Sequence, residues 1–212
     1  YSGASAEAAV AGGMVAPIRE MAGQVFALVF ILSPKSLRQK VRDLLNQLLQ
    51  HDEWETRHGA LLAIKYTVVL MANTNDSEEE CHQEEYFVEN FANQVITGLE
   101  DSNDDVQGVA AQILTFSLQS IDSNGKDTDF LPRIVRSLWK SLKNVRVVSS
   151  CINDIVKLFS KLIQRNFAIV LQAVSNNKSP LLGLIQIFSR TSELLDCELI
   201  SVKVCILQVI GA

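Results

Sequence analysis

The sequence predicts an all-α protein built from repeated helical hairpins, and three observations lead to that prediction. Apolar residues recur at helical spacing along most of the 212 residues. Turn-forming residues are sparse, with 10 Gly and 4 Pro, which disfavours a β-sandwich or barrel. A short pattern also recurs, in which an acidic or turn residue precedes an apolar–polar pair and then a small residue. Together they predict a HEAT-repeat solenoid of about five helical hairpins, the terminal ones incomplete.

Composition supports a sizeable core and argues against two classes of partner. Hydrophobic residues make up 48% and charged residues 20%, within the globular range. The net charge of −5 argues against a general grip on nucleic acid, and the Arg and Lys residues of 133–146 and 157–165 are scattered. No apolar run reaches the roughly 18 residues that a membrane span requires. We therefore expect neither direct nucleic-acid binding nor membrane insertion.

The first helix is expected after a short leader. Residues 1–13 are rich in Ala, Gly and Ser, which predicts a disordered or frayed leader, and 14–212 are expected to form the repeat array. Residues 14–32 have helical spacing, with Pro17 in the first turn, where its missing N–H costs nothing. Because the chain starts at Tyr1 and stops inside an apolar helical pattern, we expect a piece of a longer protein.

The next two helices have recognisable starts. Ser33 is expected to cap the helix of 35–50, with Pro34 at its first position. Asp52 is placed as the cap of a broadly apolar helix of about 53–73. That second helix has apolar residues on more than one side, which predicts neighbours on both flanks.

Beyond this helix the pattern is interrupted and then resumes. Residues 74–85 contain six carboxylates in twelve positions, which predicts a solvated acidic loop insertion. Asn124–Gly125 predicts a turn, and Pro180 is expected to interrupt the helix that contains it. The helices expected after the insertion are 86–99, 104–121, 129–143, 145–164, 167–189 and one that begins near 198.

The recurring pattern has a structural interpretation. In it, the acid caps a helix, the small residue lets the paired helix approach, and the long polar residue reaches the acid of an adjacent repeat. These polar markers are 38, 50, 39 and 57 residues apart, from residue 19 to residue 203. Two intervals fall just short of the roughly 40–47-residue period of HEAT and armadillo units; the acidic insertion explains the interval of 50, and that of 57 requires a further insertion around 175–197. The residues assigned to this framework are Pro17, Arg19, Arg57, Gly59, Ala60, Gln107, Ala110 and Arg146.

No pattern for catalysis, cofactor binding or metal binding is present. Gly125-Lys126-Asp127 lacks the loop and the hydroxyl of a phosphate-binding motif. His51 and His58 lack the further ligands that zinc would need, and Cys81-His82 is better explained as part of a solvated loop. We therefore expect no catalytic, cofactor-binding or metal-binding residues in this segment. The four cysteines form no CxxC pair and are expected to be buried free thiols in a reducing compartment.

Each tryptophan allows two interpretations. Trp54, in the first turn of its helix, could anchor a partner or pack on the preceding helix. For both Trp54 and Trp139 burial statistics favour a place in the core, more strongly for Trp139.

Three blocks of sequence carry a specific resemblance. Residues 14–20 read Met-Val-Ala-Pro-Ile-Arg-Glu, residues 54–66 begin Trp-Glu-Thr-Arg-His-Gly, and residues 98–106 end Asn-Asp-Asp-Val. In this order and near this spacing they resemble the Mot/BTAF family, the Snf-type ATPases that strip TATA-binding protein from DNA. The likeness covers about residues 14–120 well, is looser over 130–165, and beyond 166 is mainly one of pattern.

The resemblance implies a nuclear transcription regulator. In that family an N-terminal HEAT-repeat array grips the convex side of TATA-binding protein, and a C-terminal ATPase, absent from these 212 residues, dislodges it. The family's acidic latch is expected upstream of this segment, so the 74–85 loop is not equated with it. The implied partners are TATA-binding protein and the neighbouring HEAT repeats of the same chain.

The candidate partner-binding residues are mostly acidic. The repeat would align them along one edge, and their charge suits a basic partner surface. The alternative is that each acid only caps a helix. A second alternative is a HEAT scaffold of another class, a nuclear transport receptor or a phosphatase-type adaptor, which shares the helix caps by convergence. The candidate residues are Asp52, Glu53, Trp54, Asp101, Asp104 and Asp105.

Overall fold

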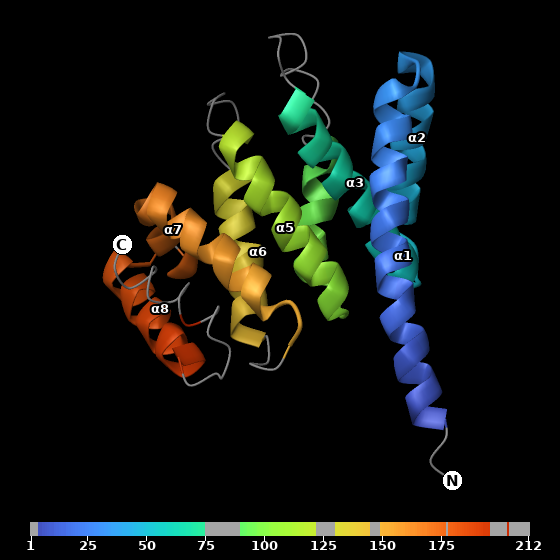
Figure 1. Cartoon of the computed structure of the whole chain (residues 1–212). Coiled ribbons are helices and arrows are strands. Elements are labelled where there is room, and N and C mark those ends of the chain that lie inside the picture. Colours follow the sequence, from blue (N-terminus) through green and yellow to red (C-terminus); the bar gives the residue numbers. More distant parts are fainter. Residues whose placement is uncertain are drawn as a thin grey trace. The chain divides into compact units, whose positions relative to one another are not determined.

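The computed structural model describes the helical parts of the chain and the short turns between some of them (Figure 1). They fall into two compact units, Tyr1–Val88 and Glu89–Ala212. Every regular element among the described residues is an α-helix, which confirms the all-α, helical-repeat class. The described residues are 4–74, 90–121, 130–144, 149–176, 178–195 and 203.

The described part of the first unit contains three helices, α1 (Ala4–Leu32), α2 (Lys35–Leu48) and α3 (Trp54–Thr74). Both α1 and α2 pack against α3. The broad apolar surface of α3 is therefore covered from two sides, as its sequence predicts, and Leu61 and Leu62 are almost completely buried.

The N-terminal helix is longer than the sequence analysis predicts. It begins at Ala4, so residues 4–13 differ from the expected frayed leader, and Pro17 lies inside the helix instead of in its first turn. Alanine-rich sequence has the highest helix propensity, which accounts for the extension. At the next boundary Pro34 takes the N-cap position, and the hydroxyl of Ser33 donates to the Val29 carbonyl at 2.6 Å instead of capping α2.

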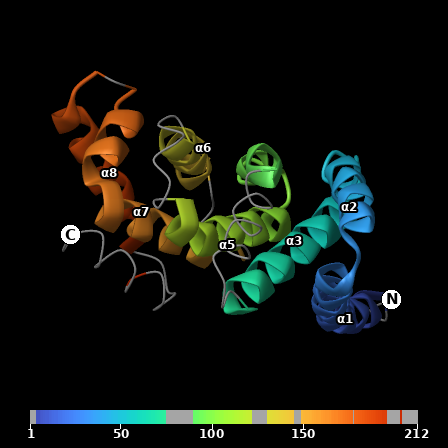
Figure 2. The ribbon, with the colours of Figure 1, turned by 90° about the horizontal axis from the view of Figure 1, so that it is seen from above.

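The second unit is arranged around α7. After the helical residues 90–98 come α5 (Asp104–Ile121), α6 (Phe130–Asn144), α7 (Ile152–Val174) and α8 (Pro180–Leu195). Helices α5, α6 and α8 each pack against α7. Figure 2 shows two layers within this unit, with α5 and α7 in one and α6 and residues 90–98 in the other.

Aromatic packing joins the two layers of the second unit. Trp139 of α6 is buried, and its ring stacks on that of Phe159 of α7 with the ring centroids 5.7 Å apart. The prediction that Trp139 belongs to the core is confirmed. Aromatic pairs in this geometry stabilise a core by about 0.5–1.5 kcal/mol beyond their burial.

Most helix boundaries of the second unit match the prediction. Helix α5 spans the predicted residues 104–121, and Pro180 is the first residue of α8, which confirms the interruption there. Asn166 has non-helical angles (φ −142°, ψ 57°) and separates the two predicted helices. Helix α7 starts at Ile152 instead of at 145, because residues 149–151 form part of the turn before it.

Several predictions lie outside the described residues. They include residues 75–85 of the acidic insertion, the turn at 122–125, the helix expected near 198 apart from Lys203, and the framework residue Arg146. Of the cysteines only Cys151 is described, and it is free and buried as predicted. No described helix combines the length and the apolar character needed to cross a membrane.

Candidate functional site

The turn before α3 presents two exposed carboxylates. The Arg57 backbone N–H donates to the Glu53 carbonyl, so Glu53 takes the N-cap position of α3. Asp52, the predicted N-cap residue, lies one residue before it. The guanidinium of Arg57 donates to the backbone carbonyls of His51 and Asp52, at 2.8 and 2.7 Å. The turn that carries Asp52 and Glu53 is thereby tied to the body of α3, and both carboxylates are exposed.

Trp54 is half-buried and packs toward α1. The Arg19 guanidinium lies over its indole ring, 5.2 Å from the ring centroid, and the His58 ring lies 6.2 Å away. The structure therefore places Trp54 against a preceding helix, one of the two predicted alternatives. A role as partner anchor stays a prediction.

The N-terminus of α5 is capped by the side-chain amide of an asparagine and not by an acid. The Asn103 side-chain oxygen accepts hydrogen bonds from the N–H groups of Asp105 and Val106, at 2.9 and 3.3 Å. Asp101 in turn accepts a hydrogen bond from the Asn103 N–H at 2.9 Å. The predicted acid cap is therefore wrong at this helix. Asp104 and Asp105 occupy its first turn, where carboxylates favourably oppose the helix dipole.

Arg57 and Gln107 have equivalent roles in the two units. Each is the fourth residue of its helix and donates to a carbonyl of its own preceding turn, Gln107 to that of Asp101. Arg38 takes the same position in α2 and donates to the Ser33 carbonyl at 2.8 Å. That these long polar residues also reach an acid of the adjacent repeat stays a prediction. Helical side chains lean toward the N-terminus, so the nearest acceptors are the preceding turn's carbonyls.

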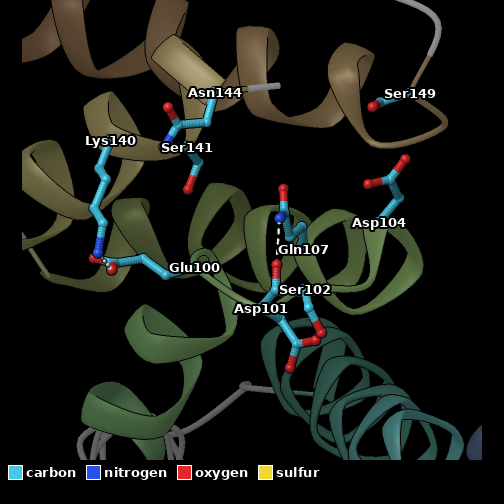
Figure 3. Close-up of a pocket in the computed structure, with 9 residues that line it drawn as sticks. All are labelled: Glu100, Asp101, Ser102, Asp104, Gln107, Lys140, Ser141, Asn144 and Ser149. Atoms are coloured by element: carbon cyan, nitrogen blue, oxygen red, sulfur yellow. Dashed lines mark hydrogen bonds and ion pairs between the residues drawn. The ribbon is translucent and has the colours of Figure 1, made fainter. Parts of the chain in front are cut away.

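An open polar pocket of about 460 Å³ lies between this turn and the next part of the second unit. In Figure 3 the residues before and within α5 face those of α6 and of the turn before α7. Of the predicted partner-binding residues, Asp101 and Asp104 line the pocket, and Asp105 is exposed nearby. The lining residues are Glu100, Asp101, Ser102, Asp104, Gln107, Lys140, Ser141, Asn144 and Ser149.

One wall of the pocket holds an ion pair. The Lys140 ammonium contacts the Glu100 carboxylate, and its hydrogen bond lowers the pKa of Glu100, while burial acts in the opposite direction. Two serines of α6 serve the same region, because Ser137 donates to the Ile96 carbonyl at 3.1 Å and Ser141 to that of Leu99. These carbonyls lie at and just after the end of the helix of 90–98, where the helix leaves acceptors for other donors, and that of Ile96 also accepts from the Leu99 N–H at 3.1 Å.

Behind the pocket a buried thiol contacts the Gln107 amide. Cys151 Sγ lies 3.5 Å from the Gln107 side-chain oxygen, to which it donates. Burial, with a smaller effect from the Asp104 charge, raises the pKa of Cys151 to about 12. Near neutral pH the group is therefore a thiol, which is the form that can donate.

The small framework residues divide into two groups. Ala60 and Ala110 are buried. A Cβ added to Gly59 would meet nothing within 4 Å in the described part of the chain, so no close helix approach requires this glycine there. The close approaches occur instead at Gly23, which faces Tyr66 and Leu62, and at Gly183, which faces the Leu171 carbonyl.

Sequence reasoning missed Asn103, Lys140 and Gly183. A signal for Asn103 was available, because Asn directly before a helix with two acids in its first turn is a strong N-cap pattern. Nothing in the sequence pairs Lys140 with Glu100, which lie 40 residues apart. The acids before α3 and those before α5 belong to different units, so their alignment along one edge stays a prediction. Within the described ranges no group of three or more His, Cys, Asp or Glu could hold a metal ion.

Packed helical hairpins with polar residues gathered at the turns define a helical-repeat protein. The family description "ECM29, ARM-like repeats" matches residues 16–97. Human TATA-binding protein-associated factor 172 is 30% identical over 154 residues, which is 73% of this chain. The chain belongs to the Mot/BTAF family of TATA-binding protein-associated factors, as a segment of helical repeats.

Two further relatives carry the same designation. TATA-binding protein-associated factor MOT1 of Saccharomyces cerevisiae is 32% identical over 159 residues, or 70% of this chain. TATA-binding protein-associated factor BTAF1 of Arabidopsis thaliana is 32% identical over 153 residues, or 72% of this chain. The chain spans only 8% of the length of the human and yeast relatives and 7% of the Arabidopsis one.

Proposed function

We propose that this chain is a non-catalytic scaffold segment of a nuclear transcription regulator. It binds TATA-binding protein and helps an ATPase located elsewhere in the full-length protein to remove that protein from promoter DNA. The observation that carries the proposal is the likeness to TATA-binding protein-associated factors over 70% or more of the chain. The shared designation of these relatives favours this partner over the cargo of a nuclear transport receptor or the subunits of a phosphatase.

The acidic turn before α5 is the proposed contact surface in the second unit. Asn103 caps the helix, so the carboxylates of Asp104 and Asp105 are not needed for capping. Asp104 opens onto the pocket and Asp105 is exposed. A carboxylate held at a rigid helix start, without a capping role, is suited to meet a basic side chain of a partner. In the first unit the proposed contact residues are the exposed acids Asp52 and Glu53 and the half-buried Trp54.

The test is a titration of the 212-residue chain with purified TATA-binding protein at about 0.15 M ionic strength, so that surface charge is not exaggerated. We expect saturable binding, micromolar or tighter. Absence of binding by a chain with an intact helical circular dichroism spectrum would refute the proposal.

Charge reversal then locates the surface. Asp105→Lys is compared with Asp43→Lys, which reverses an acid of α2 that is also exposed. We expect Asp105→Lys to weaken binding about fivefold or more, because a carboxylate facing a basic group becomes a like charge. Asp43→Lys should change affinity little. Equal effects of the two variants would show that only net charge matters and would exclude the turn as the contact surface.

A further inference from the structure

We propose that Gln107 is a positioning residue that fixes the acidic turn before α5 in its partner-binding conformation. The inference rests on the proposed function, because the turn it acts on is the proposed contact surface. Gln107 lines the pocket, and both the nitrogen and the oxygen of its side-chain amide make a hydrogen bond. Its nitrogen donates to the Asp101 carbonyl, and its oxygen accepts from the Cys151 thiol. We call this arrangement the Gln107 clasp.

The clasp closes a short ring of hydrogen bonds around the turn. The Asp101 carboxylate accepts a hydrogen bond from the Asn103 N–H, and the Asn103 side-chain oxygen accepts from two N–H groups at the start of α5. Gln107, one helical turn later, returns to the Asp101 carbonyl. Every link lies between residues 101 and 107. Loss of the hydrogen bond from Gln107 would open the ring at Asp101, whose carboxylate belongs to the pocket-lining residues.

The second bond of the clasp reaches the following turn of the same unit. Cys151 lies directly before α7, and burial keeps it a thiol, so it can donate to the Gln107 oxygen. Arg57, the equivalent residue of α3, has only donors and cannot accept such a bond. A glutamine at this position can therefore donate to its own turn and accept from the next one, whereas an arginine could bond to both turns only by donating to both.

A matched pair of variants separates positioning from general stability. Gln112 is also on α5, is also partly buried, and donates to the Asp154 carboxylate of α7 at 2.8 Å. It lies away from the turn. Gln107→Met and Gln112→Met each replace a glutamine by a methionine of similar volume. Each variant removes one hydrogen bond, that of Gln107 with Cys151 or that of Gln112 with Asp154. Only Gln107→Met also releases the Asp101 carbonyl.

The readouts are affinity for TATA-binding protein and amide hydrogen exchange at Asn103 and Asp105. For Gln107→Met we expect affinity to fall about threefold to tenfold, the ratio that corresponds to one lost hydrogen bond, and exchange at both amides to accelerate about fivefold or more. Gln112→Met should leave both readouts near their wild-type values. Gln107→Arg keeps the donor, as in α3, and should restore slow exchange.

Three outcomes decide the proposal. Faster exchange and weaker binding in Gln107→Met alone would support it. Unchanged exchange in Gln107→Met, or faster exchange with unchanged affinity, would overturn it, because the clasp would then be absent or irrelevant to binding. A wild-type chain that does not bind TATA-binding protein overturns the proposed function and this role with it, while the exchange rates still show whether Gln107 holds the turn.

Discussion

The Arg19 guanidinium of α1 lies over the indole ring of Trp54 of α3, 5.2 Å from the ring centroid. The contact joins two of the blocks that carry the family resemblance, residues 14–20 and 54–66. It gives a physical reason for an arginine near the end of one block and a tryptophan at the start of the other. The guanidinium is attracted by the negative face of the ring, and the two helices are held in register at this point.

Removal of this cation should weaken the first unit. We expect Arg19→Met to lower the free energy of unfolding by about 0.5–1 kcal/mol, because the cation–π attraction is lost while helix propensity stays similar. Urea unfolding followed by tryptophan fluorescence in a Trp139→Phe background reports on Trp54 alone. Arg19→Lys keeps a cation and should retain part of the stability. A loss as large in Arg19→Lys as in Arg19→Met would argue against the cation–π contribution.

Two glycines should respond to alanine with opposite signs. A Cβ at Gly59 meets nothing within 4 Å among the residues that the structure describes, whereas a Cβ at Gly183 would lie 2.5 Å from the Leu171 carbonyl oxygen. We expect Gly59→Ala to raise the free energy of unfolding by about 0.5–1 kcal/mol, through helix propensity. Gly183→Ala should lower it by about 1–3 kcal/mol, because backbone must move.

Thermal unfolding measures both glycine variants, and Gly108→Ala provides the intermediate case. Its added Cβ would lie 3.5 Å from Cys151 Cβ, an ordinary van der Waals distance. That variant should be neutral or stabilising. Destabilisation by Gly59→Ala would show that another part of the chain approaches this face of α3.

The Cys151 thiol should be almost unreactive in the folded chain. Burial raises its pKa to about 12, so the reactive thiolate is negligible at pH 8, and the surrounding core also excludes reagent. We expect iodoacetamide to modify Cys151 at least about a hundredfold more slowly in buffer than in urea, as measured by peptide mass spectrometry. Rapid labelling of the native chain at Cys151 would contradict the buried position.

The raised pKa of Cys151 also predicts how the free energy of unfolding changes at high pH. The folded pKa of Cys151 lies above its ordinary value of 9.0, so the protonated form is favoured by folding. The neutral thiol therefore contributes fully below about pH 9, and its contribution is lost as the pH rises from there toward 12. Cys151→Ala should show a smaller fall in unfolding free energy over that range than the wild type.

Helix periodicity predicts the elements well because apolar spacing and breakers act locally. Helix α5 begins and ends at its predicted residues, and Pro180 begins α8, since a proline disfavours helix at the residue before it. The error at the N-terminus has a local cause too. The composition of residues 1–13 suggested a leader, whereas the helix propensity of its alanines favours the helix that the structure describes.

The candidate site is less predictable because it depends on distances between repeats. Asp101 and Asp104 could be named from charge and turn position, but the pocket they line requires Lys140, which belongs to another helix. The direction of the Gln107 amide is also not encoded in its spacing. An acid in the neighbouring repeat and a carbonyl in its own turn are equally plausible acceptors until the backbone path is known.

The Glu100–Lys140 ion pair should make a small, pH-dependent contribution to stability. The pKa of Glu100 is lowered by its hydrogen bond from Lys140, so folding favours the carboxylate. The contribution is present above the ordinary value of about 4.5 and is lost as the pH falls through the lower folded value. Because the Lys140 side chain is 63% exposed, solvent screens the pair, and we expect about 0.2–1 kcal/mol at pH 7.

The comparison of Lys140→Met with Lys143→Met isolates this pair. Both are exposed lysines of α6, and Lys143 has no ion pair among the residues with described side chains. The difference in unfolding free energy between wild type and Lys140→Met should shrink between pH 7 and pH 3, and 1 M salt at pH 7 should reduce it as well. The difference for Lys143→Met should change little over the same range. If both variants showed the same pH dependence, the general charge balance of α6, and not the contact with Glu100, would be responsible.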